Sequence, residues 1–203
     1  MRFISHLDMT RFMARMIKKA ALPIWYTEGF HSHAYITFAL PLSLGFESEY
    51  EIMDIRLEDD DFPIESICER LNNVFPEYVQ AFKAAEPKEK AGKVGYASFF
   101  VRFDDSKALI LPLKEFLESP QILCSKRTKR GEEKQIDLAK KIVKYEVTEK
   151  DGNTVLDITL PAGSNDNVNP QLLCDTFFQT APEYYPYTIT KTSVLNTEGE
   201  LFK

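Results

Sequence analysis

The sequence of 203 residues predicts an α+β fold, and three observations lead to this prediction. Apolar residues recur at helical spacing in some segments and alternate with polar residues in others. Turn and linker residues separate these segments at short intervals. Hydrophobic residues make up 44% and charged residues 28% of the chain, which is typical of a globular protein that is long enough to bury its own core.

The first half of the chain predicts six elements in the order β-α-β-β-α-β. Helix starts are marked by a serine with an acidic residue three positions later and by a proline in a first turn. Strands are marked by alternation. The order is that of a ferredoxin-like lobe. The predicted elements are a strand ending at residues 2–4, a helix from Ser5, strands at 35–40 and 49–58, a helix from Pro63 and a strand at 78–84.

The helix that begins at Ser5 is predicted to be amphipathic. Its apolar residues follow the i, i+3, i+4, i+7 pattern, and its other face is basic. Pro23 ends the helical region. The apolar positions are Met9, Phe12, Met13, Met16, Ile17 and Ala20, and the basic positions are Arg11, Arg15, Lys18 and Lys19.

The second half repeats the same order less clearly. It predicts strands at 96–103, 121–129, 142–148, 154–160 and 187–195, a helix at 108–117, and a helix from Pro170 capped by Asn169. Asp151-Gly152-Asn153 is a strong hairpin signal. A polar segment at 86–93 predicts a linker. We therefore predict tandem ferredoxin-like lobes with antiparallel sheets at residues 1–87 and 94–203, with a single larger α+β domain as the alternative.

The charge of the chain is unevenly distributed. The net charge is −6, yet residues 1–45 carry five basic and two acidic residues, a net of +3. Residues 46–90 have a net charge of −8, and residues 126–144 have a net charge of +5. Because positive charge is confined to two segments of an otherwise acidic chain, we predict a localised anion-binding surface rather than a protein that coats nucleic acid nonspecifically.

Several classes of protein are not supported by the sequence. Its apolar runs are too short to span a bilayer, and it shows no phosphate loop and no nucleophile elbow. Glu47, Glu49 and Glu51 have the period of a solvent-facing strand. Three widely spaced cysteines, Cys68, Cys124 and Cys174, predict reduced thiols in the cytoplasm rather than disulfides or a metal site. We assign no catalytic residue, no metal and no cofactor.

The three histidines offer an alternative. His6 and Asp8, together with His31 and His33, have side chains that can ligate a divalent metal, so a metal-dependent hydrolase or nuclease is conceivable. The simpler interpretation is that His6 accompanies a helix cap and that the other two decorate an exposed loop. The spacing lacks the specificity of an H-E-x-x-H motif.

The basic segments favour contact with nucleic acid. Arg11, Arg15 and Lys18 share a helix face that can neutralise phosphates, and the nearby aromatic residues can stack bases. A second basic hairpin comprises Lys126, Arg127, Lys129 and Arg130. The alternatives are a solvated helix face and aromatic residues that pack in the core. The aromatic residues concerned are Trp25, Tyr26, Phe30 and Tyr35.

The N-terminal motifs also resemble those of a known family. The run Arg2-Phe3-Ile4-Ser5-His6-Leu7-Asp8, with Glu28-Gly29-Phe30 and Leu44-Gly45, resembles the radical-SAM-linked protein family, a bacterial family of unknown function. The resemblance is close over residues 1–58 and fainter beyond. Where the family usually has an Asn-Pro-Arg-Pro-like run, this chain has His31-Ser32-His33-Ala34, and members usually carry more residues of the first strand.

The resemblance implies a partner. Members are encoded beside, or fused to, a radical SAM protein, and this sequence lacks the cysteine triad that such an enzyme needs. The resemblance thus implies an accessory that recognises a substrate or RNA without its own catalysis. His6, Asp8, Glu28, Gly29 and Phe30 are the expected contacts with a substrate or partner. A third hypothesis is a protein-binding scaffold that uses the acidic strand at residues 47–58.

Overall fold

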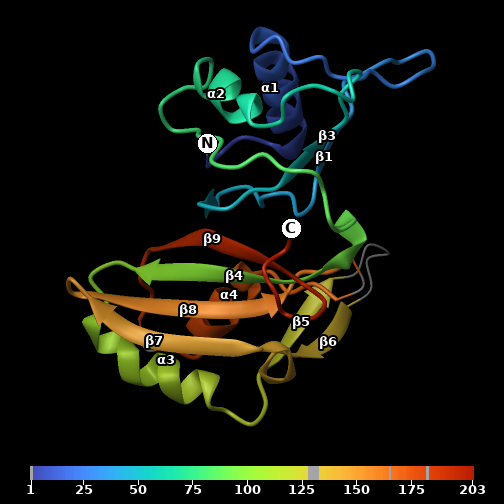
Figure 1. The fold of residues 1–203 in the computed structure, drawn as a ribbon. Helices are drawn as coiled ribbons and strands as arrows, with labels where there is room; N and C mark the ends of the chain where they lie inside the picture. Colours follow the sequence, from blue (N-terminus) through green and yellow to red (C-terminus); the bar gives the residue numbers. More distant parts are fainter. Residues whose placement is uncertain (1, 128–132, 165, 182) are drawn as a thin grey trace. The chain divides into compact units, whose positions relative to one another are not determined.

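A computed structural model describes residues 2–127, 133–164, 166–181 and 183–203 of the chain. The fold is α+β, with antiparallel and mixed sheets (Figure 1). The chain divides into two compact units. Unit 1 comprises Met1–Gly45, Glu51–Ala91 and Lys203, and unit 2 comprises Phe46–Tyr50 and Gly92–Phe202.

Unit 1 begins with the predicted amphipathic helix, α1 (His6–Lys19). Ser5 is its N-cap, and the Ser5 side chain accepts a hydrogen bond from the backbone N–H of Asp8. Met13 and Ile17 are buried on one face of the helix, as their spacing predicts. The helix is therefore confirmed, with its apolar side directed into unit 1.

The strands of unit 1 are short. β1 (Ile36–Phe38) and β3 (Met53–Ile55) form a two-stranded antiparallel sheet, and a second helix, α2 (Ser66–Asn72), follows. Isolated bridges continue the pairing beyond the sheet. Apolar residues from α1, α2 and these strands meet in one buried cluster, which comprises Ile17, Ala20, Leu22, Ile24, Ala34, Ile67 and Leu71.

Two strands expected at the ends of this half are not formed. In the described structure Arg2 meets Gly45 through a backbone bond (Gly45 N to Arg2 O, 2.8 Å), and residues 2–4 join no ladder. The backbone of Ala81 instead pairs with the side chain of Asn72, whose amide donates to Ala81 O and accepts from Ala81 N, each at 2.8 Å. Because a side chain satisfies the backbone of Ala81, that residue needs no strand partner, and residues 78–84 form no strand. The tandem arrangement of two lobes is thus not confirmed.

The predicted strand at 49–58 is also shorter than expected. Only β3 within it is a strand, whereas the preceding residues form β2 (Glu47–Ser48), which belongs to unit 2 and pairs in parallel with β9 (Tyr187–Asn196). The acidic and apolar alternation is therefore shared between two different sheets. The carboxylates that the scaffold hypothesis places on one strand therefore belong to two different units.

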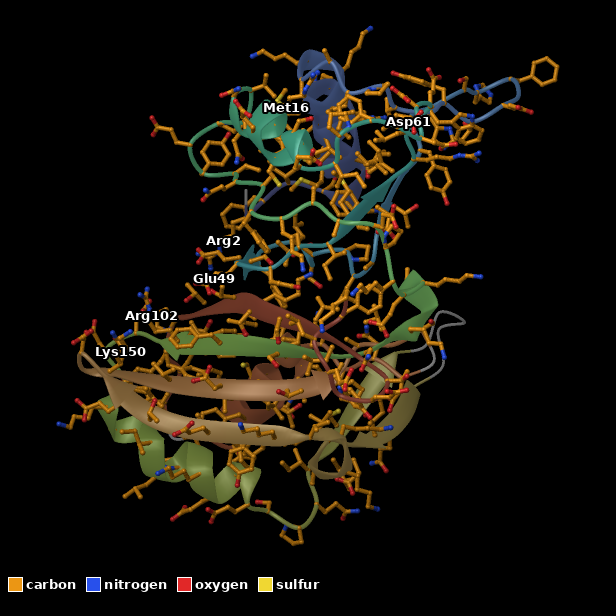
Figure 2. All side chains as sticks on the ribbon, viewed as in Figure 1. Arg2, Met16, Glu49, Asp61, Arg102 and Lys150 are labelled. Atoms are coloured by element: carbon orange, nitrogen blue, oxygen red, sulfur yellow. The ribbon has the colours of Figure 1, made fainter. Side chains whose placement is uncertain are left out.

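Unit 2 contains a five-stranded sheet in the order β2-β9-β4-β8-β7. Its long strands are β4 (Val94–Phe103), β7 (Lys144–Lys150), β8 (Asn153–Pro161) and β9, and these four strands pair with one another in antiparallel fashion. Asp151 and Gly152 have φ values of 52° and 81°, as expected of the predicted turn between β7 and β8. Figure 2 shows Arg102 on β4 and Lys150 on β7 at the same end of this sheet.

The described residues of unit 2 form two α-helices, and both agree with the prediction. A 3₁₀ turn, η2 (Lys107–Leu109), leads into α3 (Ile110–Leu117), and α4 (Pro170–Phe178) begins after Asn169, whose side chain accepts from Gln171 N. The ring of Phe103 on β4 lies 5.9 Å from that of Phe178 on α4, so this helix packs on the sheet. None of the described helices is long and apolar enough to cross a membrane.

The remaining elements of unit 2 are small. β5 (Leu123–Arg127) and β6 (Glu133–Asp137) form a separate two-stranded antiparallel sheet. Residues 128–132, which include Lys129 and Arg130 of the predicted basic hairpin, lie outside the described residues. The 3₁₀ turns η1 (Ala91–Lys93) and η3 (Ala139–Lys141) precede β4 and β7.

Candidate functional site

Helix α1 presents three basic side chains on one face. Arg11, Arg15 and Lys18 follow one another at spacings of four and three residues, which places them on the same side of the helix. All three are exposed, and the buried Met13 and Ile17 lie on the other side. The predicted residues therefore form one solvent-facing row, which we call the basic stripe.

Asp8 is fixed at the N-terminal end of the basic stripe. The Ser5 hydroxyl donates to its Oδ2 at 2.7 Å, and Arg11 donates to its Oδ1 at 3.2 Å. These two hydrogen bonds, the Ser5 bond first, lower the pKa of Asp8 below its ordinary value of 3.8. Asp8 is thus a carboxylate that begins the helix and partly neutralises Arg11.

His6 takes part in packing at the same end of α1. Its ring meets the ring of Phe38 edge-on, with the centroids 5.5 Å apart. The Thr10 hydroxyl donates to its backbone oxygen at 3.0 Å. His6 is nevertheless exposed to solvent, so it can both support β1 and meet a partner.

Residues 25–35 form a projecting hairpin, which we call the arm. Tyr26 and Ala34 form an antiparallel bridge, and Thr27 N donates to His33 O at 2.9 Å. In Figure 1 the arm is the blue loop that extends away from α1 within unit 1. The predicted loop is therefore an ordered hairpin.

The tip of the arm carries the predicted Glu28, Gly29 and Phe30. Gly29 has a φ of 115°, a conformation that side chains with a Cβ rarely adopt. Phe30 is the most exposed large hydrophobic residue described, at 105% of its reference area. Glu28 is exposed as well. Phe30 therefore lies on the surface and does not pack in the core, as an aromatic residue more commonly does.

The base of the arm is an aromatic pair held by an arginine. Trp25 and Tyr35 meet edge-on with ring centroids 5.9 Å apart, and the Arg56 guanidinium carbon lies 4.4 Å from the Trp25 centroid. The pair is partly exposed, since Tyr35 is 43% accessible. Arg56 is missed by reasoning from sequence because it lies far from Trp25 along the chain. Pairing between two strand segments brings them together, with Trp25 N donating to Arg56 O.

The structure does not gather the proposed metal ligands. Among the described residues, no group of three histidine, cysteine or acidic side chains is arranged to hold a metal ion. His33 Nδ1 instead lies 3.0 Å from Thr27 Oγ1 and 3.0 Å from His31 O. Asp8 is engaged by Ser5 and Arg11, as described above. The alternative of a metal-dependent hydrolase therefore gains no geometric support.

The second basic segment is only partly described. Lys126 and Arg127 lie in β5, where their backbones pair with Lys134 and Glu133 of β6. Lys129 and Arg130 lie outside the described residues. The structure thus shows a hairpin at this place without showing how its basic side chains are arranged.

Unit 2 also contains an open cavity of about 620 Å³ between α3, α4 and the start of β5. Phe116 and Phe177 form part of its wall, with ring centroids 5.3 Å apart. Glu115 is the one ionisable side chain among the described residues that line it. A single carboxyl supplies no paired acid and base, so the cavity does not resemble a hydrolytic site.

Comparison with known proteins gives a family and no function. A family model described as "Uncharacterized protein conserved in bacteria (DUF2344)" matches residues 1–170. The match includes α1, the arm and most of the unit 2 sheet. No curated protein matches the chain.

Proposed function

Since the chain belongs to the DUF2344 family, whose members are uncharacterised, we propose its function from the geometry of unit 1. We propose that the protein is a recognition module that binds RNA and has no catalytic activity of its own. The basic stripe would contact phosphates, and Asp8 and His6 would fix the start of the helix that presents it.

The observation that carries this proposal is the exposure of the basic stripe. Arg15 and Lys18 are exposed, and neither forms an ion pair with a side chain of the described residues. Arg11 is held by Asp8 through an exposed pair, which a phosphate can replace at little cost. Three cations on one rigid helix face match a row of phosphates better than scattered charges do.

Salt-dependent binding to single-stranded RNA tests the proposal. A labelled oligoribonucleotide is titrated with the protein by fluorescence anisotropy between about 50 and 200 mM salt. Arg11→Ala combined with Arg15→Ala should weaken binding and reduce the slope of log K against log salt by about 1.4, or about 0.7 per lost phosphate contact. Lys88→Ala combined with Lys90→Ala changes the net charge equally in the exposed linker and should have little effect.

Two results would contradict the proposal. One is an absence of binding at low salt, and the other is equal slopes for the stripe variant and the linker variant. In either case the basic stripe is a solvated helix face.

We further propose that a radical SAM protein is the partner. The proposal rests on the resemblance of the N-terminal motifs described above and on the cysteines. Cys68, Cys124 and Cys174 lie far apart in the sequence and lack the close spacing of an iron–sulfur cluster motif. Cysteines that form no disulfide among the described residues also favour a reducing compartment, and we propose the cytoplasm. Co-purification of the two proteins after nuclease treatment tests this partnership without RNA as a bridge.

We also infer that unit 2 is a ferredoxin-like lobe. The chain order β4-α3-β7-β8-α4-β9, with sheet order β9-β4-β8-β7, supports this inference, and β5 and β6 would be an insertion. Unit 1 has the order α1-β1-β3-α2, which is the central part of the same arrangement. The fold alone carries no function.

A further inference from the structure

The arm combines a fixed backbone with an exposed ring. The Phe30 side chain contacts no described aromatic group and is fully exposed, although burying it elsewhere would be favourable. The backbone that carries it is nevertheless paired on both sides of the turn, at the Tyr26–Ala34 bridge and between Thr27 and His33. A flexible loop would let the ring fold back onto the unit 1 surface. This hairpin holds it in solvent.

His33 locks the turn of the arm. Its Nδ1 lies 3.0 Å from the backbone oxygen of His31 and 3.0 Å from the Thr27 hydroxyl. The ring can therefore hydrogen-bond within the turn in either tautomer, as a donor to the His31 oxygen or as an acceptor from the Thr27 hydroxyl. The backbone N–H of His33 donates to Thr27 Oγ1 at 3.1 Å. Gly29, at a φ of 115°, completes the turn. The direction of Phe30 is therefore set by hydrogen bonds within the arm.

The surroundings of Phe30 do not match a protein interface. Glu28, Gly29, His31 and Ser32 are all exposed and offer little apolar surface. A stable protein interface needs roughly 800 Å² per partner around an apolar centre, which one ring on a narrow turn does not provide. A single flat ring held in solvent is instead the form in which proteins stack an unpaired base.

A second group of aromatic side chains lies at the base of the arm. Trp25 and Tyr35 are in contact there, and Arg56 lies over the Trp25 ring at 4.4 Å. Along an extended strand, Trp25 and Phe30 are at most about 17 Å apart, at roughly 3.3 Å per residue. One short oligonucleotide can therefore contact both Phe30 and the Trp25–Tyr35 pair.

We propose that the arm binds unpaired bases of single-stranded RNA, with Phe30 as the principal stacking residue and the Trp25–Tyr35 pair as a second platform. The proposal rests on the proposed function, because it names the form of RNA that the basic stripe would hold. Gly29 and His33 are positioning residues that set the direction of Phe30.

The arm and the basic stripe have different electrostatic signatures. The arm itself carries Glu28 and no arginine or lysine, so it releases no counterions from RNA. Stacking on Phe30 should consequently multiply the affinity for RNA by the same factor at every salt concentration. The basic stripe should instead determine the salt slope. One experiment can therefore separate the two contributions.

The test compares a labelled uridine 12-mer with the same strand annealed to its complement, by anisotropy across a range of salt. Phe30→Ala should weaken binding of the single strand by about 5- to 150-fold, the range expected for the loss of one stacked base, without changing the salt slope. Phe30→Trp should retain binding, and neither variant should alter binding of the duplex, whose bases are paired. Tyr78→Ala removes another exposed ring of unit 1 and is the matched control.

The outcomes separate this inference from the proposed function. If the wild-type protein binds neither probe at low salt, both fall. If it binds with the expected salt slope but Phe30→Ala stays within twofold of wild type, the stacking inference is overturned and the proposed function stands. Equal losses on the single strand and the duplex would also overturn the stacking inference. Because Phe30 is fully exposed, circular dichroism should show that each variant keeps the native fold.

Discussion

Units 1 and 2 differ in how they are stabilised. Unit 2 is built on a five-stranded sheet whose β4 and β9 each have ten residues, and Val101, Phe103 and Leu160 are fully buried. Unit 1 has strands of only three residues and relies on α1 and α2 to close a small apolar cluster. The basic stripe and the most exposed large hydrophobic residue described, Phe30, both lie on the less strongly packed unit. Recognition segments are commonly found in regions of lower local stability.

The largest effect is expected from emptying the core of unit 2. Phe103→Ala should lower the free energy of unfolding by about 3–5 kcal/mol, because a fully buried ring leaves a cavity. The rings of Phe178 and Tyr187, at 5.9 and 5.7 Å, also lose their contact with it. Urea unfolding followed by circular dichroism measures the change. A loss below about 1 kcal/mol would mean that this sheet is not the stable part of the molecule.

The corresponding change in unit 1 tests whether the units are separate. Ile17→Ala should cost about 2–3 kcal/mol, near the low end for such truncations, since many neighbours in the cluster are only partly buried and can relax. Hydrogen exchange should show faster exchange in α1 and α2 and unchanged protection in β4 and β8. Equal loss of protection in both units would contradict the comparison, because it would mean that they unfold as one.

The two units also differ in how far the sequence predicts them. α1, α3, α4 and the β7–β8 hairpin are confirmed because their signals are local, namely helical spacing, caps and an Asp-Gly turn. The strand at residues 78–84 is wrong because a strand exists only where another backbone pairs with it. Here the Asn72 amide takes that place. Alternation alone does not reveal such a competitor.

The candidate site, too, is predictable from the sequence only where its signals are local. Helical spacing predicts the exposed face of α1, which carries Arg11 and Arg15. The exposure of Phe30 depends on the hydrogen bonds that hold the arm, and aromatic residues are buried in most proteins. The stacking of Arg56 on Trp25 joins two distant segments, so no local pattern signals it. Its prediction requires the strand pairing itself.

A polar link in unit 2 should have an intermediate effect. Ser106 is fully buried, and its hydroxyl donates to Phe103 O at 2.6 Å and accepts from Thr154 N at 2.8 Å. Ser106→Ala leaves the buried Thr154 N–H without this acceptor and should cost about 1–3 kcal/mol. Thermal unfolding measures the loss. Ser119→Ala, at a half-buried residue just beyond α3 whose hydroxyl donates to Glu115 O at 3.0 Å, is the control and should change stability by less than about 0.5 kcal/mol.

The helix cap of unit 1 should matter less. Ser5→Ala removes the acceptor for Asp8 N and should cost about 1 kcal/mol at pH 7. The pKa of Asp8 is lowered in the folded protein, so the stability that it contributes is present above the ordinary value of 3.8 and is lost as the pH falls through the folded pKa. The difference in the free energy of unfolding between wild type and Ser5→Ala should therefore become smaller below pH 4. Ser43→Ala should leave the free energy of unfolding unchanged at every pH. A difference that grows in acid would be inconsistent with this role of Asp8.

The smallest effect concerns a like-charged pair on the sheet of unit 2. Glu146 on β7 lies directly opposite Asp157 on β8. Partial burial, and then the Glu146 carboxylate, raise the pKa of Asp157 above 3.8, so the folded state holds this proton more tightly than the unfolded chain. Stability therefore decreases as the pH rises through the interval between the unfolded and folded pKa values, and the repulsion persists at pH 7.

Glu146→Gln should remove that repulsion, raise the stability at pH 7 by about 0.2–1 kcal/mol and return the pKa of Asp157 toward its ordinary value. NMR titration and thermal unfolding at several pH values measure the two quantities. Glu149→Gln on the same strand instead breaks an exposed ion pair with Lys107 (3.3 Å) and should give no gain. If both variants stabilise unit 2 equally, the gain comes from reduced overall negative charge rather than from this pair. Removing any carboxylate would then stabilise the protein, because the chain as a whole is acidic and its negative charges repel one another.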